Sequence, residues 1–283
     1  AYRRIRNTCR FMLGNFYDFN MKTDARPVAS MSELDRFILH KLHNVVEKAV
    51  TAYENYEFHT IYHSLHNFCV VDLSSFYLDI IKDRLYASTP DAPARRDAQA
   101  VMAMILDALV KIMAPILPFT ADEIYTHMPM ADAHRKESVH LEGMVALNDD
   151  WEDAELAEKW EKIRALRAEV TKALEEARKA KLIGHPLDAS VKIKLPEGEL
   201  SDLLASLEMP LHDVFIVSQA DLADAIDGEV YEGKEIEGLA ILVSKADGEK
   251  CERCWRFDTT IGDDTEHPTA CHRCATALKA ILA

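Results

Sequence analysis

Two Cys-x-x-Cys pairs near the end of the chain constrain its fold more than any other feature of the sequence. The segment CERCWRFDTTIGDDTEHPTACHRC places sixteen residues between the pair Cys251 and Cys254 and the pair Cys271 and Cys274. Each pair can present two thiolates to one ion, and two pairs complete the tetrahedral shell that is typical of structural zinc. Because four thiolates leave no open position for water, we expect one structural Zn²⁺ and not a catalytic metal.

Other uses of the cysteines and their neighbours were weighed against this prediction. A redox dithiol would need one pair beside a βαβ pattern, whereas this chain has two pairs. His267 and His272 are close enough in sequence to replace one thiolate as a ligand. The remaining cysteines, Cys9 and Cys69, stand alone among apolar residues and are expected to be small core residues. Cysteines used in this way favour a reducing compartment, the cytoplasm.

Glycine usage divides the chain into parts. Only Gly14 and Gly143 occur in the first 145 residues, where apolar residues follow a helical period, which predicts an all-helical domain over 1–145. A long helix followed by a small α+β module is expected over 146–248, and the zinc-binding domain over 249–283. The predicted fold class is therefore mainly α.

The apolar pattern also predicts individual elements. The expected helices include residues 5–16, a helix that begins at the N-cap Ser32, and segments 61–86, 95–113, 152–182 and 200–208. The expected strands are 190–195, 213–217 and 239–244.

Two helix ends carry specific predictions. The spacing Thr120-x-x-Glu123 is that of a capping box, and Phe119 and Ile124 occupy the positions of a hydrophobic staple, so a helix is expected to restart there after a break at two prolines. Gly184 is expected to cap the C-terminal end of the long helix.

The formal charge of −15 argues against a generally basic nucleic-acid-binding surface. The charge is uneven, because residues 1–145 hold 16 basic and 18 acidic residues whereas residues 146–283 hold 17 and 30. Local patches decide binding within about 8–10 Å. No apolar run is long enough to cross a membrane and no signal peptide is evident, so no membrane partner is expected. The absence of an initial Met suggests a fragment of a longer protein.

One face of the first helix is basic. Arg3, Arg6 and Arg10 are spaced to lie on the same side, and the first ten residues contain no acidic residue. Arginine matches the geometry of phosphate, so this face is predicted to contact a nucleic-acid backbone. The segment 161–182 is also rich in basic residues, but we interpret it as a solvated helix face.

The zinc-binding segment contains an aromatic residue between two arginines. Arg253, Trp255 and Arg256 form a set suited to stacking on unpaired bases and to contacting phosphate. The alternative is that Trp255 packs beneath the metal site as its miniature core. The sequence favours neither interpretation.

Catalytic patterns are missing. The sequence has no glycine-rich phosphate loop, and its histidines pair with no nucleophile pattern. The tetrapeptide Leu182-Ile183-Gly184-His185 is superficially similar to the HIGH signature of class I aminoacyl-tRNA synthetases. It lies where a helix ends, whereas HIGH lies where a nucleotide-binding helix begins, so we interpret it as a helix stop.

Six segments together resemble one family over nearly the whole chain. They are YRRIRNTCRFMLGN (2–15), HNFCVVDLSSFYLDIIKDRLY (66–86), MAPILPFTADEIY (113–125), VHLEGM (139–144), IGHPLDASV (183–191) and the CERCW…CHRC segment. In this order they resemble bacterial isoleucyl-tRNA synthetase, a class Ia aminoacyl-tRNA synthetase. A departure is Cys9, where a small residue such as Ala is more usual.

The resemblance implies that the chain is the C-terminal third of such an enzyme. Residues 1–145 would be the anticodon-binding helical bundle, and the rest a junction module and zinc domain that complete the hold on the anticodon arm of isoleucine tRNA. The full-length enzyme attaches isoleucine to its tRNA using ATP, but its catalytic and editing domains would lie outside this chain. The fragment alone is therefore expected to be inactive, monomeric and cytoplasmic.

Two other classes of protein share some of these features. One is a stand-alone zinc-containing tRNA-binding or scaffold protein without catalytic activity. The other is a formamidopyrimidine-type DNA glycosylase, because a similar four-cysteine segment closes those enzymes. A glycosylase needs a catalytic N-terminal proline with an acidic neighbour, and the start AYRRIR offers neither.

Overall fold

The computed structural model describes residues 1–129 and 136–282. The chain divides into two compact units, which are described separately. Unit 1 comprises Ala1–Leu85 and Pro90–Ala157, and unit 2 comprises Tyr86–Thr89 and Glu158–Ala283. No helix in the described part of the chain is long and apolar enough to cross a membrane.

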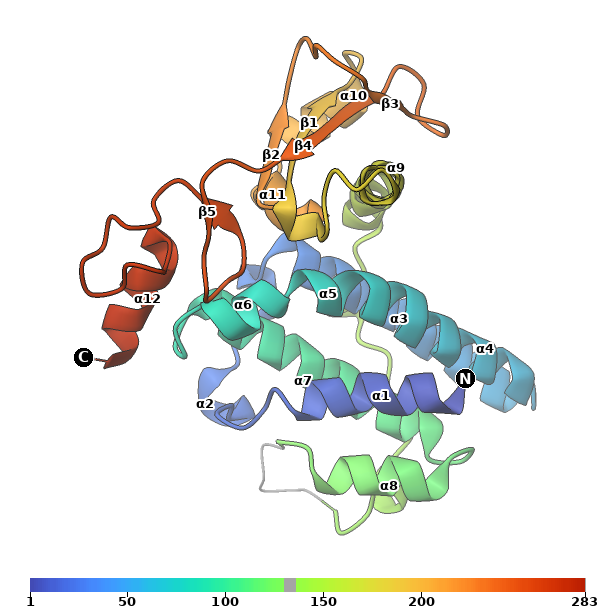
Figure 1. Ribbon diagram of the computed structural model, residues 1–283. Helices are drawn as coiled ribbons and strands as arrows, with labels where there is room; N and C mark the ends of the chain where they lie inside the picture. Colours follow the sequence, from blue (N-terminus) through green and yellow to red (C-terminus); the bar gives the residue numbers. More distant parts are fainter. Residues whose placement is uncertain (130–135, 283) are drawn as a thin grey trace. The chain divides into compact units, whose positions relative to one another are not determined.

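Unit 1 is helical, as predicted (Figure 1). Its elements are α1 (Tyr2–Leu13), α2 (Met21–Asp24), η1 (Val28–Ser30), α3 (Glu33–Glu54), α4 (Phe58–Asn67), η2 (Phe68–Tyr77), α5 (Leu78–Ile80), α6 (Lys82–Ala87), α7 (Pro93–Met113), α8 (Pro118–Thr126), η3 (Val139–Leu141) and η4 (Asp149–Trp151). The last two residues of α6 belong to unit 2.

The core of unit 1 is built around α7. From Ala98 to Met113 this helix is mostly apolar and buried, and it packs against α1, α3 and α8. A helical segment of this kind is stable in water only when neighbouring helices cover it. The facing stripe of α3 is buried through Leu34, Phe37 and Ile38, as the apolar spacing predicted. Cys9 and Cys69 are both fully buried, and burial raises the pKa of Cys9 to about 12, which confirms that they are core residues.

The segment predicted as one helix over 61–86 is almost continuous but not regular. Its middle part, η2, is π-helical. The hydroxyl of Ser74 donates to the carbonyl of Cys69 (2.7 Å) and that of Ser75 to the carbonyl of Val71 (2.8 Å). Hydroxyl groups that bond within the ladder of a helix are a recognised cause of such distortions. The apolar period alone did not reveal this change of pitch.

Of the two predicted helix N-caps, Ser32 is confirmed and Thr120 is wrong. Ser32 caps α3, and its hydroxyl accepts a hydrogen bond from the N–H of Asp35, as predicted. The capping box at Thr120 is wrong, because α8 begins two residues earlier with Pro118 at its first position. Proline has a φ suited to that position and lacks the N–H that would otherwise be unpaired. The staple is also wrong, since Phe119 is 90% exposed.

Unit 2 combines one long helix with a small sheet and the cysteine segment. Its elements are most of α9 (Ala154–Lys179), η5 (Pro186–Asp188), β1 (Ala189–Lys194), α10 (Glu199–Ala205), α11 (Leu211–Phe215), β2 (Gln219–Leu222), β3 (Tyr231–Glu232), β4 (Ala240–Lys245), β5 (Glu249–Lys250), β6 (Phe257–Asp258) and α12 (His272–Leu282). The predicted stripe of α9 is buried at Trp160, Ile163 and Leu166.

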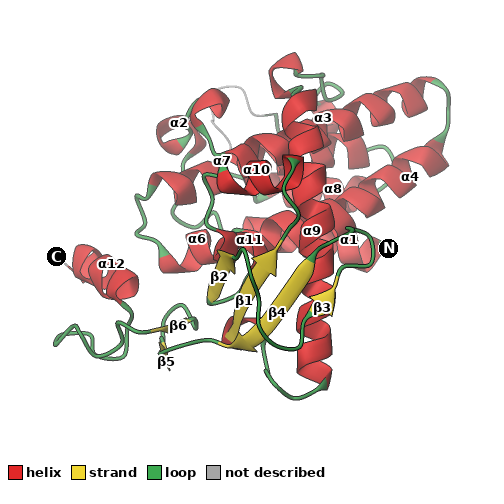
Figure 2. Cartoon of the chain, turned by 90° about the horizontal axis from the view of Figure 1, so that it is seen from above, coloured by secondary structure: helices red, strands yellow, loops and turns green. Residues whose placement is uncertain are grey.

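The main sheet has the order β2-β1-β4-β3 (Figure 2). The central strand β1 runs parallel to β2 and antiparallel to β4, and its Val191 lies opposite Ala220 and Val243. The strand predicted at 213–217 is wrong. That segment overlaps the end of α11, which follows Pro210, and the strand parallel to β1 comes later. A short apolar run does not distinguish a strand from a buried helical turn.

The long helix α9 ends in a left-handed residue that is not the predicted glycine. Lys181 has φ +60°. Its N–H donates to the carbonyl of Arg178 (3.0 Å), and the N–H of Leu182 donates to that of Ala177 (3.0 Å). These two bonds form a Schellman motif in which Lys181 takes the position that glycine usually occupies. The prediction that Gly184 caps this helix is therefore wrong.

Candidate zinc centre and nucleic-acid interface

The four predicted cysteines converge on one point in unit 2. Their sulfur atoms all lie within 4.8 Å of one another. The β5–β6 hairpin precedes and follows the first pair, and the second pair lies at the start of α12. The N–H of Cys271 donates to the Sγ of Cys251 (3.3 Å), so the backbone of one pair supports a sulfur of the other.

The cluster fits a zinc ion in chemistry and in size. The sulfurs of Cys254 and Cys271 are 3.8 Å apart. A tetrahedron with Zn–S bonds of about 2.3 Å has edges of about 3.8 Å. Within the described residues neither His267 nor His272 belongs to the cluster, so the set is four thiols. This donor set closes the shell and supports a structural role.

Charge explains why the cluster needs a cation. A hydrogen bond from the thiol of Cys274 lowers the pKa of Cys254 to about 4. The same hydrogen bond, together with burial, raises the pKa of Cys274. Thiols in such close contact cannot all be ionised by themselves, because each thiolate opposes the next. A divalent cation removes this conflict and allows all four to ionise.

Trp255 does not form the core of the zinc-binding segment. Its side chain is 60% exposed, so the packing alternative is wrong. Its N–H donates to the carbonyl of Cys251 (2.9 Å), which closes the first cysteine turn and places Trp255 at φ +66°. A left-handed backbone costs a bulky residue about 1–2 kcal/mol. An exposed indole held in such a conformation is a candidate functional side chain.

The two neighbouring arginines already have protein partners. Arg256 forms an ion pair with Asp213, and the guanidinium of Arg253 donates to the carbonyl of Ala87. Both contacts lie within unit 2, but the partners are 43 and 166 residues away in sequence. Sequence reasoning missed these partners because nothing local signals them. The arrangement does not bring the two guanidinium groups to Trp255 as free cations.

The basic face of α1 has the predicted form. Arg3, Arg6 and Arg10 are exposed, whereas Ile5 and Cys9 on the other face are buried. None of the three guanidinium groups forms an ion pair within the described residues. Arg4, on the same helix, is also exposed and forms no ion pair with a described residue, whereas Arg26, Arg36, Arg84, Arg95 and Arg96 are paired. The arginines of α1 are thus the unusual ones among the described arginines of unit 1.

The comparisons with known proteins assign this architecture. Residues 35–193 match the family described as "Anticodon-binding domain of tRNA ligase", which is more than half of the chain. The chain belongs to this family. Residues 248–277 of this anticodon-binding chain match a second family, "Zinc finger found in FPG and IleRS", and so include all four cysteines. A DNA glycosylase could explain the match to the second family but not the match to the first.

Curated relatives extend the similarity to the whole anticodon-binding chain. The isoleucine–tRNA ligase of Geobacter sulfurreducens is 50% identical over 279 residues, which are 99% of this chain and 30% of the relative. The isoleucine–tRNA ligase of Desulforamulus reducens is 47% identical over 281 residues, and that of Persephonella marina is 44% identical over 279. The chain spans about 30% of the length of these relatives.

Proposed function

We propose that this chain is the tRNA-binding C-terminal part of an isoleucine–tRNA ligase. The observation that carries the proposal is the 50% identity to such an enzyme over 99% of the chain. The complete protein would join isoleucine to its tRNA with ATP, and the groups that bind ATP and isoleucine would lie outside this chain. The proposal includes a monomer in the cytoplasm.

In this proposal unit 1 supplies attraction to the tRNA backbone through Arg3, Arg6 and Arg10. The three groups are exposed and have no acidic partner within the described residues. Phosphate contacts fix the position of a nucleic acid but carry little sequence information. We therefore assign this face to affinity and not to choice of tRNA.

Unit 2 would contact the anticodon region. One zinc bound by Cys251, Cys254, Cys271 and Cys274 would fix the β5–β6 hairpin and hold Trp255 outward. Unpaired bases are commonly recognised by stacking on aromatic side chains. Arg253 and Arg256 would then act through position, by fixing the zinc-binding segment within unit 2. The divisions at 145 and 248 remain part of the proposal.

The proposal is tested by binding of the purified chain to bacterial isoleucine tRNA and to the same tRNA with an altered anticodon. We expect the altered tRNA to bind at least tenfold more weakly, in line with the loss of one stacked base at about 1–3 kcal/mol. Equal binding of both tRNAs would contradict the proposal. It would indicate a protein without anticodon preference, such as a scaffold.

A matched pair of variants tests the role of α1. Arg6→Gln should weaken both tRNAs about fivefold at 0.15 M salt and reduce the salt slope by about one. The control is Lys48→Gln, since Lys48 is exposed on α3 and has no ion-pair partner within the described residues. A control that weakens binding as much as Arg6→Gln would show that only overall charge matters.

A further inference from the structure

A groove beside Trp255 combines basic and apolar walls. It has a volume of about 690 Å³ and lies entirely within unit 2. The end of α9 contributes Arg178 and Lys181, β4 contributes Lys245, and the β5–β6 hairpin contributes Lys250 and Phe257. The segment 161–182 was interpreted from the sequence as a solvated face, which did not anticipate this groove.

The charges in the groove are unbalanced toward the positive. Lys181, Lys245 and Lys250 are exposed, and none forms an ion pair within the described residues. Arg178 pairs with Glu175 on the same helix (2.8 Å). The lining carboxylate, Asp188, accepts hydrogen bonds from two backbone N–H groups, of Gly184 and His185. Three ammonium groups therefore remain available to an anion.

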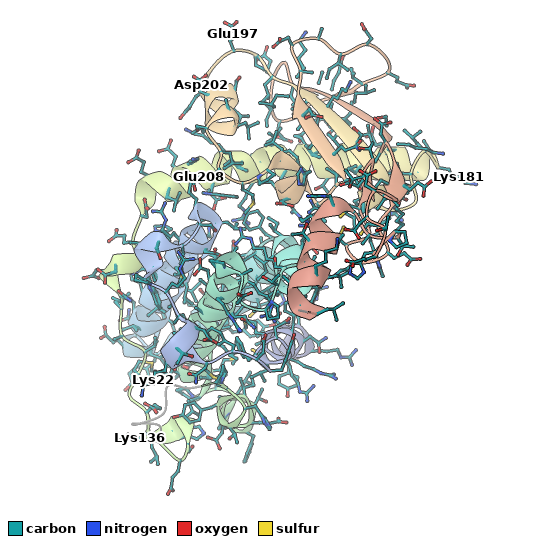
Figure 3. All side chains as sticks on the ribbon, turned by 90° about the vertical axis from the view of Figure 1, so that its left-hand side faces the viewer. Lys22, Lys136, Lys181, Glu197, Asp202 and Glu208 are labelled. Atoms are coloured by element: carbon teal, nitrogen blue, oxygen red, sulfur yellow. The ribbon has the colours of Figure 1, made fainter. Side chains whose placement is uncertain are left out.

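This surface is an exception within an acidic protein. The chain as a whole has a formal charge of −15. The acidic residues Glu197, Asp202 and Glu208 lie toward the N-terminal end of α9 in unit 2, whereas Lys181 lies at its C-terminal end (Figure 3). A polyanion approaching unit 2 is thus repelled at one end and attracted at the other, since local charge governs the approach.

Lys250 connects the groove to the exposed indole. Its Nζ lies 5.6 Å from the centre of the Trp255 ring, so one lysine both lines the groove and contacts the aromatic face. Phe257 is the aromatic residue that lines the groove itself. Ammonium groups beside an aromatic ring provide for the two parts of an unpaired nucleotide, its phosphate and its base.

Two residues of this surface have left-handed backbones. Lys181 (φ +60°) and Trp255 (φ +66°) are among the four described non-glycine residues with positive φ. Glycine would fit either position without steric cost. That a cation and a large aromatic occupy them instead, at the same groove, is consistent with side chains kept for binding.

We propose that this groove binds an unpaired RNA strand, with phosphates at Lys181, Lys245 and Lys250 and one base on Trp255. The inference rests on the proposed function and goes beyond it by naming the surface that the anticodon loop occupies. A paired RNA helix keeps its bases stacked within it and does not offer one to an indole. The occupant is therefore a single strand and not a duplex.

The test neutralises the three lysines together. The variant Lys181→Gln/Lys245→Gln/Lys250→Gln is compared with Lys192→Gln/Lys194→Gln/Lys234→Gln, which removes three exposed lysines of unit 2 that do not line the groove. The probes are bacterial isoleucine tRNA, an RNA hairpin that carries its anticodon loop, and a fully paired RNA of the same length. Circular dichroism and zinc content verify that both variants fold.

We expect the groove variant to bind the tRNA and the hairpin about 50-fold more weakly at 0.15 M salt. Each lost phosphate contact should reduce the slope of log K against log salt concentration by about 0.7, and three lost contacts together give this loss of affinity. The control variant should bind within about threefold of the unsubstituted chain, since its lysines are assigned no phosphate contact. Equal weakening by the two variants, or unchanged binding by the groove variant, would overturn the groove assignment while leaving the proposed function in place.

Two further outcomes are decisive. If the unsubstituted chain binds neither the tRNA nor the hairpin, the proposed function fails and the groove inference fails with it. If the paired RNA or poly-glutamate competes as well as the hairpin, the groove is a general anion surface, which contradicts the assignment to an unpaired strand. Preference for the hairpin over both competitors supports it.

Discussion

The two units of this chain are held together by different physics. Unit 1 surrounds the largely buried α7 with other helices, and buried polar groups are paired within the unit, as Asp35 is with Tyr77 and Arg84. Unit 2 has an apolar core on α9 and the small sheet, with Trp160, Val191 and Ile241 among its buried residues, and a separate cluster built on four thiols. Among the described residues only the end of unit 2 has a cluster that could hold a metal ion, so we expect that end alone to depend on zinc for its fold.

The units also differ in where their basic residues go. In unit 1 most of the described arginines outside α1 form ion pairs, and the four on α1 are exposed without one. In unit 2 the two arginines beside Trp255 have protein partners, and lysines supply the exposed charge of the groove. The sequence predicted the exposed arginines of α1, but it did not predict the exposed lysines of the groove.

The largest expected effect that separates the units is removal of the metal. Structural zinc is worth about 10–16 kcal/mol to the folding of small domains, so a strong chelator should unfold residues after about 249. Hydrogen exchange should then show loss of protection in β5, β6 and α12, with α3 and α7 unchanged. Equal loss of protection throughout the chain would contradict a metal dependence confined to the end of unit 2. A purified chain with no bound zinc would contradict the metal dependence itself.

In unit 1 the corresponding large effect on stability should come from a buried carboxylate. Asp35 is fully buried and accepts hydrogen bonds from Tyr77 Oη (2.7 Å) and Arg84 Nη1 (2.9 Å). Asp35→Ala should lower the free energy of unfolding by about 3–5 kcal/mol, because it removes the carboxylate partner of the half-buried guanidinium of Arg84 and of the buried hydroxyl of Tyr77. Chemical denaturation measures this loss, and zinc content should not change.

Its control is Asp107→Ala, which removes an i,i+4 pair with Lys111 (2.8 Å) and should cost about 0.5 kcal/mol or less. If the two substitutions lowered the free energy of unfolding equally, the buried network around Asp35 would stabilise unit 1 no more than the single Asp107–Lys111 ion pair does.

Acid should affect unit 2 through Glu169. Burial raises the pKa of this carboxyl. Hydrogen bonds from Lys172, the N–H of Lys234 and Tyr231 together lower the pKa by more than burial raises it, so the net pKa is below its usual value. The stability that it contributes is therefore complete above the ordinary pKa of about 4.3 and is lost as the pH falls through the lower folded value. Glu169→Gln should flatten this acid dependence and cost about 1–3 kcal/mol at pH 7.

The readout is the midpoint of urea unfolding of unit 2 between pH 7 and pH 3, followed by hydrogen exchange of β4. Acid loss of zinc also destabilises unit 2, so both proteins are compared at matched zinc content. A variant with the same acid slope as the original protein would exclude Glu169 as the source of that slope.

The smallest expected effect concerns the end of α9. Lys181→Gly should raise the free energy of unfolding by about 0.5–1 kcal/mol, because glycine accepts the left-handed backbone that lysine strains to adopt. Lys179→Gly removes the same charge at the last helical residue, where the backbone is right-handed, and should lower stability by about 0.5 kcal/mol. Thermal unfolding of the two variants should thus shift in opposite directions, and shifts of the same sign would contradict the Schellman assignment.

Much of the fold was predictable because it follows from local chemistry. The buried stripes of α3 and α9, the N-cap Ser32 and the four cysteines are each set by residue type and spacing. The errors are of one kind. The start of α8, the helix α11 and the left-handed Lys181 depend on backbone geometry that several residue types can adopt, so their sequences do not distinguish the alternatives.

The candidate site was only partly predictable for a related reason. The exposed stripe on α1 is periodic within one helix, so its residues could be named from the sequence. The partners of Arg253 and Arg256, and the lysines of the groove, come from segments far apart in the chain. Only folding brings such residues together. Nothing in the sequence signals that the two arginines beside Trp255 are already occupied.

The proposed contact of Trp255 with the anticodon loop of a tRNA can be tested by a crosslink from this position. A photoreactive phenylalanine analogue at position 255 would be irradiated with bacterial isoleucine tRNA, and the linked nucleotide would be mapped. We predict a crosslink to an unpaired nucleotide of the anticodon loop, with zinc content unchanged. A crosslink confined to the acceptor stem, or efficient tRNA binding with no crosslink to the loop, would contradict the proposed contact.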